Sequence, residues 1–174
     1  MQINGLISRL KMHAATINTL AAGISDAQAA WKPAPGQWSV LEVLNHLLDE
    51  EIEDFRAHLD FILFHPDQPW PRIDPQGWVA LRAYNQRRLA PSLAAFNQAR
   101  QDSLAWLAGL NTPDWNSVYQ LPFGPLCAGD LAAAWVGHDL LHIRQLVELH
   151  WAAAVRDFAP YRLDYAGSWD GENE

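Results

Sequence analysis

Hydrophobic residues recur at helical spacing over four long stretches of the chain, which are separated by breaks rich in proline and glycine. In residues 2–22 one face carries the aliphatic side chains of Ile3, Leu6, Leu10, Ile17 and Leu20. Gly23 follows as a typical helix stop. A short helical turn is expected from Ser25 to Ala30, before a segment with two prolines and a glycine ends the pattern.

The second long stretch begins with a helix-start signal. Ser39-Val-Leu-Glu42 has the form of a capping box, in which the serine caps the first turn and the glutamate reaches back to the backbone. We expect this helix to run from about Val40 to about Phe64. Its core face is predicted to carry Leu41, Leu44, Leu48, Ile52, Phe55, Leu59 and Ile62.

The third and fourth stretches follow proline-containing connections. Asp74-Pro75 is a sound helix start, and a helix is predicted from Gln76 to about Leu110, kinked or split at Pro91. Asn111 to Gly129 is expected to be a long irregular connection. Asp130 is expected to cap the last helix, from Leu131 to about Ala154.

These elements predict an all-α fold, a four-helix bundle that forms a single domain over residues 1–174. No stretch alternates clearly enough to predict a strand. The last helix is followed by four aromatic residues, which predict a C-terminal tail packed back on the body: Phe158, Tyr161, Tyr165 and Trp169. Residues Gly171 to Glu174 are expected to fray.

Composition narrows the class of protein. A net charge of -8 argues against nucleic acid as a partner, because a basic face is the expected footprint of phosphate binding. A single cysteine, Cys127, allows no internal disulfide, as expected in a reducing compartment. There is no signal-peptide pattern and no apolar run near the ~18 residues of a membrane span. We therefore expect a soluble, cytoplasmic protein without a membrane partner.

Nine tryptophans are many for this length, and four lie where they can line a pocket or close one end of a bundle: Trp31, Trp38, Trp70 and Trp115.

Two histidines share one face of the last helix. His138 and His142 are four residues apart and therefore lie one above the other. The same face carries Leu131, Trp135, Leu146 and Leu149, so both imidazoles stand in an apolar stripe. Buried imidazoles need a polar partner, and one metal ion can serve both. A metal site would still require a third ligand.

The second helix offers a third histidine near its start. His46 lies toward the border of the apolar face, one turn before Glu50. Spacing alone leaves two hypotheses open. His46 is either a boundary residue paired with Glu50 at i, i+4, or a metal ligand.

The other histidines are expected outside such a site. His13 is expected to be a surface or filler residue, and His58 and His65 lie too far along the second helix. His150 projects about a third of a turn away from His138, which predicts a surface or helix-end position.

Five further residues are predicted to lie at the surface or have two possible roles. Asp49 and Asp139 each adjoin a ligand candidate in sequence, Glu50 and His138, but helical geometry points them elsewhere, so both are expected at the surface. Cys127 is either a small buried hydrophobic residue or a thiol that approaches the site. The pair Arg144-Gln145 either binds an anionic substrate or pairs with surface acids.

Two segments resemble the DinB superfamily, the family named for damage-inducible bacterial proteins. They are W-S-V-L-E-V-L-N-H-L-L-D-E-E at residues 38–51 and G-H-D-L-L-H-I-R-Q-L at residues 137–146, and D-Y-A-G-S-W at residues 164–169 adds to the likeness. The resemblance covers essentially the whole chain. It implies a four-helix bundle with a three-histidine metal site, and it assigns His46, His138 and His142 as the ligands.

Three imidazoles leave at least one coordination position open, which is typical of catalytic sites. Zinc and nickel are the expected ions and iron is a further alternative, since imidazole suits all three. Glu50 would be a further ligand, an acceptor for an imidazole N–H, a general base or a solvated helix carboxylate.

The resemblance implies a metal-dependent enzyme of the thiol-dependent transferase or hydrolase type, with a small-molecule substrate and a low-molecular-weight thiol as partner. Two alternatives stay open. One is a non-catalytic metal-binding or stress-response bundle, and the other is an interaction module without metal. Many relatives form dimers, so a homodimer is also expected.

Overall fold

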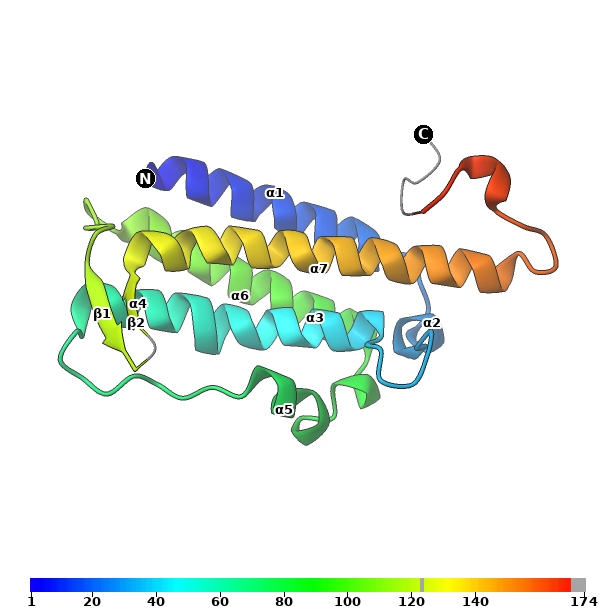
Figure 1. Cartoon of the computed structure of the whole chain (residues 1–174), viewed down its shortest axis with the longest axis horizontal. Coiled ribbons are helices and arrows are strands. Elements are labelled where there is room, and N and C mark those ends of the chain that lie inside the picture. The colour runs from blue at the N-terminus through cyan, green and yellow to red at the C-terminus, as the bar shows by residue number, and fades with distance from the viewer. Residues whose placement is uncertain (123, 170–174) are drawn as a thin grey trace.

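Four long helical segments lie side by side in the computed structural model, which describes residues 1–122 and 124–169 (Figure 1). They are α1 (Ile3–Ala21), the continuous run α3 (Val40–Asp49), η1 (Glu50–Phe55) and α4 (Arg56–Phe64), then α6 (Leu89–Gly109) and α7 (Ala128–Asp157). The shorter elements are α2 (Asp26–Ala30), α5 (Pro75–Leu81), η2 (Tyr84–Gln86), the strands β1 (Val118–Leu121) and β2 (Gly124–Cys127), and η3 (Asp164–Ala166). The predicted four-helix bundle is therefore confirmed.

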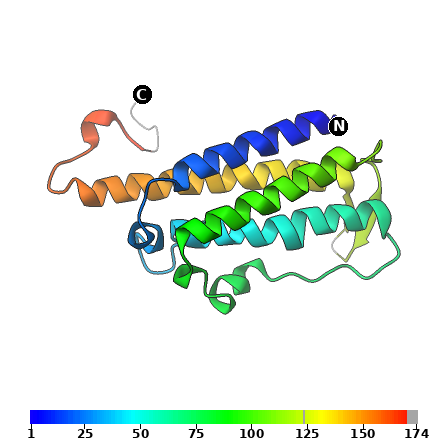
Figure 2. The same cartoon turned by 180° about the vertical axis from the view of Figure 1, so that it is seen from behind.

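The bundle pairs helices that are distant in sequence. Both α1 and α3 pack against α6 and α7. Seen from behind, α6 lies in front of the bundle beside α1 and the α3–α4 run (Figure 2). Within the described residues, no helix is both long and apolar enough to cross a membrane.

The core consists of two hydrophobic clusters with buried polar side chains between them. One cluster includes Ile17, Leu44 and Phe96, and the other includes Leu10, Leu59 and Trp135. Polar residues occupy the middle of each long helical segment and are almost fully buried: His13, Glu51, Arg100 and Asp139. Because buried polar groups must be paired, this layer fixes how the four segments align.

The second helical segment starts as predicted but changes its winding halfway. Ser39 accepts from the Glu42 backbone N–H and Glu42 accepts from the Ser39 N–H, which confirms the capping box. The segment then passes through the π-helical turn η1. A π turn holds more residues than an α turn and rotates the following side chains. Glu51 is therefore buried, whereas Ile52, predicted in the core, is 41% exposed.

The third helical stretch breaks earlier than predicted. Arg82 to Arg88 connects α5 to α6 through η2, and Ala83 adopts a left-handed conformation. Pro91 lies in the first turn of α6 and does not kink it. Proline is tolerated there because the first N–H groups of a helix have no intrahelical partner.

A β-hairpin occupies part of the connection that was expected to be irregular. Strands β1 and β2 pair antiparallel, with Val118 opposite Cys127. Directly after the hairpin, α7 begins at Ala128, and its cap is Cys127, whose Sγ accepts from the Asp130 N–H at 3.3 Å. The prediction of Asp130 as the cap was therefore wrong, and Asp130 lies in the first turn.

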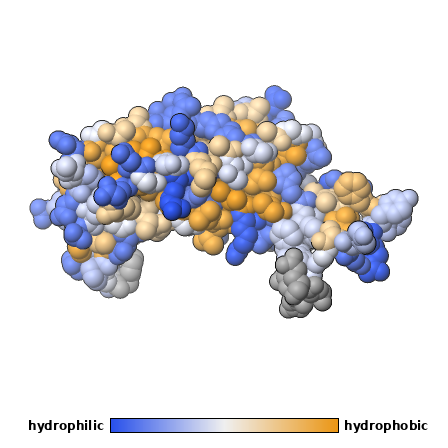
Figure 3. All heavy atoms as spheres, turned by 90° about the horizontal axis from the view of Figure 1, so that it is seen from above, coloured by the Kyte–Doolittle hydropathy of each residue, from blue (hydrophilic) through white to orange (hydrophobic). Residues whose placement is uncertain are grey.

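The tail packs less than predicted. Helix α7 extends past the other helices, and the following segment projects from the body (Figures 1 and 3). Phe158, Tyr161 and Tyr165 are exposed. Trp169 does fold back, and its ring stacks on Trp151 with centroids 5.0 Å apart. Residues 171–174, expected to fray, lie outside the described residues.

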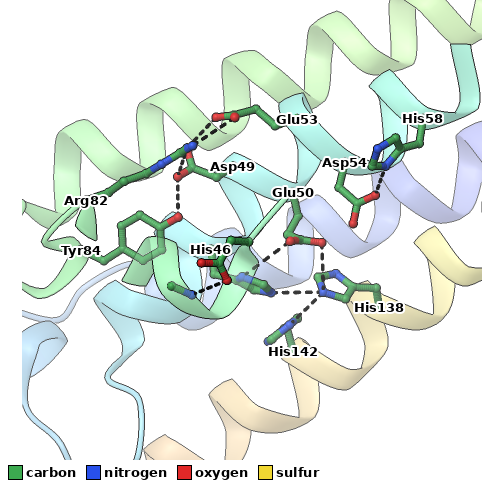
Figure 4. Close-up of polar contacts among 12 residues, drawn as sticks. His46, Asp49, Glu50, Glu53, Asp54, His58, Arg82, Tyr84, His138 and His142 are labelled. Carbon is green, nitrogen blue, oxygen red and sulfur yellow. Dashed lines mark hydrogen bonds and ion pairs between the residues drawn. The ribbon is translucent and has the colours of Figure 1, made fainter. Parts of the chain in front are cut away.

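A buried clamp attaches the segment of α5 and η2 to α3. The Tyr84 hydroxyl donates to Asp49 Oδ2 at 2.5 Å, and Arg82 donates to Asp49 at 2.7 Å and to both oxygens of Glu53 (Figure 4). Asp49 is only 7% exposed, so its prediction as a surface residue was wrong. Its partners come from a distant connection, which helical spacing does not show.

Tyr84→Phe is expected to lower the free energy of unfolding by about 1–3 kcal/mol, because the buried Asp49 carboxylate loses a donor. Tyr119→Phe is the matched control, since its hydroxyl donates to the Gln68 backbone oxygen at an exposed position. Its expected effect is within about 0.5 kcal/mol. Urea denaturation measures both changes, and equal losses would contradict a stabilising role of the clamp.

Candidate metal centre

Three histidines from two helices converge inside the bundle. His46 lies on α3, just before the π turn, and His138 and His142 lie on successive turns of α7 (Figure 4). His138 Nε2 is 3.2 Å from the Nε2 atoms of both His46 and His142. One nitrogen from each ring lies within 4.8 Å of the other two. The structure thus brings together the three residues that the family resemblance assigned as ligands.

The environment keeps these imidazoles neutral. Burial lowers the pKa of His46 to about 3, with a contribution from the neighbouring rings of His142 and His138. Burial and the His142 ring lower the pKa of His138 to about 4. The pKa of His142 is also lowered by burial. A neutral imidazole has an unprotonated nitrogen, which is the form that binds metals.

Gln145, three residues after His142, fixes which nitrogen of the His142 ring is unprotonated. His142 Nδ1 donates to Gln145 Oε1 at 2.8 Å, so Nε2 is left unprotonated and directed at His138. The Trp38 ring lies parallel to His142 at a centroid distance of 6.3 Å, and it meets His46 edge-on at 4.9 Å. Gln145 and Trp38 therefore hold two of the three rings in place. Gln145 therefore contacts the histidine cluster. This contact is neither of the two roles that the sequence left open for Arg144-Gln145, which were binding of an anionic substrate and pairing with surface acids.

Glu50 is the carboxyl group beside the cluster. It is 4% exposed, so the hypothesis of a solvated carboxylate was wrong. Its Oε1 lies 4.0 Å from His46 Nδ1, and its Oε2 lies 3.9 Å from His138 Nε2. Burial, a hydrogen bond to Asp54 and the charge of Asp54 raise the pKa of Glu50 to about 9. Glu50 therefore holds its proton at neutral pH when no cation is near.

A hydrogen-bonded chain leads from Glu50 away from the histidines. Asp54 bonds to Glu50. It also accepts from His58 Nδ1 at 2.6 Å (Figure 4). His58 Nε2 lies 3.1 Å from the Pro71 carbonyl oxygen. Burial alone would raise the pKa of Asp54, but the bonds from His58 and Glu50 outweigh it and lower the pKa. His58 stays outside the three-histidine cluster, as predicted, but it is buried and connected to Glu50 through Asp54.

A second polar centre lies directly behind the histidines. Arg100 is 2% exposed and donates to both oxygens of Asp139 at 2.7 and 2.9 Å, and its Nε donates to Glu51 at 2.9 Å. Trp135 Nε1 donates to the other oxygen of Glu51 at 3.0 Å. Asp139 was predicted at the surface, and this prediction was wrong. The two carboxylates follow Glu50 and His138 in sequence, so this network joins the same two helices as the histidines do.

The remaining candidates lie outside the cluster. His13 is buried, with Nδ1 3.3 Å from Asp139 Oδ2, and His150 Nε2 lies 2.6 Å from the Leu20 carbonyl oxygen. Cys127 caps α7. Arg144 is exposed and pairs with Glu148 at 3.3 Å.

Two of the three nitrogen–nitrogen separations in the cluster match those around a divalent ion, and the third is within 4.8 Å. Imidazole nitrogens bound at ~2.0–2.1 Å around a tetrahedral ion lie about 3.3–3.4 Å apart, close to the two 3.2 Å separations here. Glu50 Oε1 is buried without a hydrogen-bond partner, and such groups are rare in the absence of a ligand or water. The three imidazole Nε2 atoms, with this carboxyl group beside them, are a donor set that fits a divalent metal ion.

A cavity of about 570 Å³ reaches the cluster at His142. Its walls come from the segment before α3, from α5 and from α7, and they include Trp38, Gln76 and Gln145. A small molecule entering this cavity therefore meets His142. The size is within the usual range of small-molecule sites.

Comparison with known protein families decides the affiliation of the chain. The model of the DinB superfamily matches residues 9–146, which include all three histidines. The chain belongs to the DinB superfamily. A comparison with functionally curated proteins found no match.

Two solved structures share the fold of this DinB chain. YfiT from Bacillus subtilis, described as a probable metal-dependent hydrolase with an unusual four-helix bundle topology, superimposes with a TM-score of 0.76 at 19% identity, covering 88% of each chain. A mutant of the mycothiol-dependent maleylpyruvate isomerase superimposes with a TM-score of 0.67 at 8% identity. That match covers 84% of this chain and 61% of the isomerase. At these identities the likeness establishes the fold alone.

Proposed function

We propose that this protein is a divalent-metal-dependent enzyme whose metal ligands are His46, His138 and His142. The observation that carries the proposal is the convergence of three neutral imidazole nitrogens, 3.2 Å apart in two pairs, with His142 in the wall of a cavity. Zinc and nickel are the ions we propose, since both accept three imidazoles and leave a position for a further ligand.

A bound divalent ion would act as a Lewis acid and lower the pKa of a thiol or water held at its open position. The protein's own residues do the rest. Gln145 orients His142, and Trp38 covers the rings on the cavity side. Glu50 is the nearest carboxyl group and can hold or release a proton beside His138.

For the reaction, we propose thiol-dependent transfer or hydrolysis of a small molecule. The proposal is supported by the fold shared with a protein described as a probable metal-dependent hydrolase and with a mycothiol-dependent isomerase. It is also supported by the open site, because a cavity beside a three-ligand ion admits both a thiol and an electrophile. Fold likeness on its own does not assign chemistry, so the reaction must be measured.

The test uses protein loaded with Zn²⁺ or Ni²⁺ in two assays. In the first, 2-mercaptoethanol and 1-chloro-2,4-dinitrobenzene are supplied, and a carbon–sulfur bond forms as chloride leaves and the thiol loses its proton. In the second, a p-nitrophenyl ester is hydrolysed without thiol. Metal-dependent activity in either assay, lost in His138→Ala, is the expected result. A fully loaded protein inactive in both contradicts the enzymatic proposal.

One observation favours the alternative of a non-catalytic metal-binding bundle. Glu50 is buried 3.9–4.0 Å from His46 and His138, and a small movement would let it close the coordination shell. A closed shell predicts that Glu50→Gln frees a position for exogenous ligands. Thiol binding to the Ni²⁺-loaded wild type, seen as a thiolate-to-metal absorption band, would exclude this closed form.

Gln145→Leu is expected to weaken metal binding by about 10- to 100-fold, because His142 loses the acceptor that fixes its tautomer and ring orientation. Competition with a chromophoric chelator measures the dissociation constant. Gln98→Leu is the matched control, since Gln98 is exposed on α6 and donates to Asp102 on the same helix. Equal affinity of Gln145→Leu and wild type would contradict a role of Gln145 in orienting His142.

A further inference from the structure

The side chains that line the cavity beside His142 include one carboxylate and no lysine or arginine. Besides the His142 imidazole, the polar lining of the cavity consists of three amide side chains and one carboxylate, those of Gln37, Gln76, Gln145 and Glu148. Trp38 adds an aromatic wall, and neither lysine nor arginine lines this cavity. The fixed charge around a bound molecule is therefore negative.

Cationic side chains near the cavity are already engaged. Lys32 and Arg144 adjoin lining residues along the chain. Lys32 Nζ lies 2.7 Å from the buried carboxylate of Glu42. Arg144 pairs with Glu148 at 3.3 Å, but its side chain is 69% exposed, and exposed pairs of this kind are weak and screened by solvent. Lys32 is therefore held by Glu42, and Arg144 offsets the negative charge of Glu148 only weakly.

The amide and aromatic side chains of the lining determine which chemical groups it can bind. Each glutamine amide offers both donors and an acceptor, so it pairs with hydroxyl, amide or ammonium groups. The indole of Trp38 offers an apolar face to a flat or aliphatic portion of the ligand and attracts cations. A carboxylate or phosphate would instead lose its hydration beside Glu148 without gaining a cationic partner.

We propose that this cavity selects ligands whose non-reacting part is neutral or positively charged and bears hydrogen-bonding groups, and that it rejects anionic ones. The inference rests on the proposed function for the donor atom that reaches the histidines. The charge preference itself comes from the cavity lining and is measured in the metal-free protein, because a bound divalent ion would add its own positive charge beside His142. For a thiol-dependent enzyme, it points to an amine-bearing or hydroxyl-bearing thiol and away from a carboxylate-bearing one.

The experiment compares three thiols of similar size: cysteamine, 2-mercaptoethanol and mercaptoacetate. Each is titrated into the Ni²⁺-loaded protein, where the thiolate-to-metal absorption band reports binding. The same titrations of the metal-free protein follow the indole N–H resonance of Trp38, identified with the Trp38→Phe variant. We expect cysteamine to bind roughly tenfold more tightly than mercaptoacetate, the effect of one nearby charge at a partly solvated site.

Two variants at one position and a matched control isolate the charge. Glu148→Gln should shrink the difference between cysteamine and mercaptoacetate, and Glu148→Lys should reverse it. Asp102→Lys changes the net charge of the protein by the same amount as Glu148→Lys, at an exposed position on α6, and should leave the order unchanged. Because each thiol is compared with itself between variants, differences in thiol ionisation cancel.

The results separate the two proposals. A protein that takes up no Ni²⁺ would overturn the proposed function, while the titration of the metal-free form would still decide the charge preference. In the metal-free protein, mercaptoacetate binding as tightly as cysteamine, or an order that Glu148→Lys does not change, would overturn the inference about the cavity. The expected order in the metal-free protein would support it.

Discussion

Arg100→Met is expected to lower the free energy of unfolding by about 3–5 kcal/mol. The guanidinium is 2% exposed and pairs with two carboxylates, Glu51 and Asp139, that are each 1% exposed. Removing it leaves both carboxylates buried without their cation. Burial raises the pKa of Glu51, so part of the loss is relieved by uptake of a proton.

Urea denaturation of Arg100→Met and of a matched control measures this loss. Arg144→Met removes an arginine whose one ion pair, to Glu148, is exposed, and it should change stability by less than about 1 kcal/mol. Arg100→Met combined with Glu51→Gln and Asp139→Asn should recover part of the loss, because no buried charge then stands unpaired. If Arg100→Met were as stable as the control, the network would not hold the four helical segments together.

Replacement of each clustered histidine by alanine is expected to weaken divalent-metal binding by roughly a hundredfold or more, since two imidazoles remain where three had converged. His46→Ala, His138→Ala and His142→Ala are compared with wild type by chelator competition. His65→Ala is the matched control, because His65 is a half-exposed histidine outside the cluster. A variant that keeps wild-type affinity would remove that histidine from the ligand set.

Much of the fold was predictable from the helical spacing of the hydrophobic residues. The buried positions of α1, Leu6, Leu10, His13 and Ile17, follow one helical face. The pair His138 and His142 was predictable for the same reason, because four residues bring two side chains onto one face. His46 needed the family resemblance, since its position at the border of a helix face is equally typical of a paired surface histidine.

The buried polar layer of His13, Glu51, Arg100 and Asp139 could not be predicted from the sequence, for a physical reason. A charged residue on a helix is usually solvated, and only its partners on other segments make burial acceptable. Asp139 is buried because Arg100 reaches it from α6, and no local pattern indicates that contact. Glu50 and Glu51 stand in the acidic run D-E-E-I-E-D at residues 49–54, which is typical of a solvated face, and only the π turn directs both into the bundle.

The β-hairpin and the break before α6 could not be predicted from the pattern of hydrophobic and polar residues. The hairpin of β1 and β2 has four residues per strand, too few for alternation to be distinguished from chance. Pro91 fits the first turn of α6 as well as it would fit a kink, so the position of the break depended on the Tyr84–Asp49 clamp.

The most direct test of the metal centre is elemental analysis of wild-type protein purified without added metal, beside the triple variant His46→Ala, His138→Ala, His142→Ala. We expect close to one divalent ion per wild-type chain, and none in the triple variant when circular dichroism shows that it is folded. Wild-type protein that carries no divalent ion and cannot be loaded with Zn²⁺ or Ni²⁺ would contradict the three-histidine metal site.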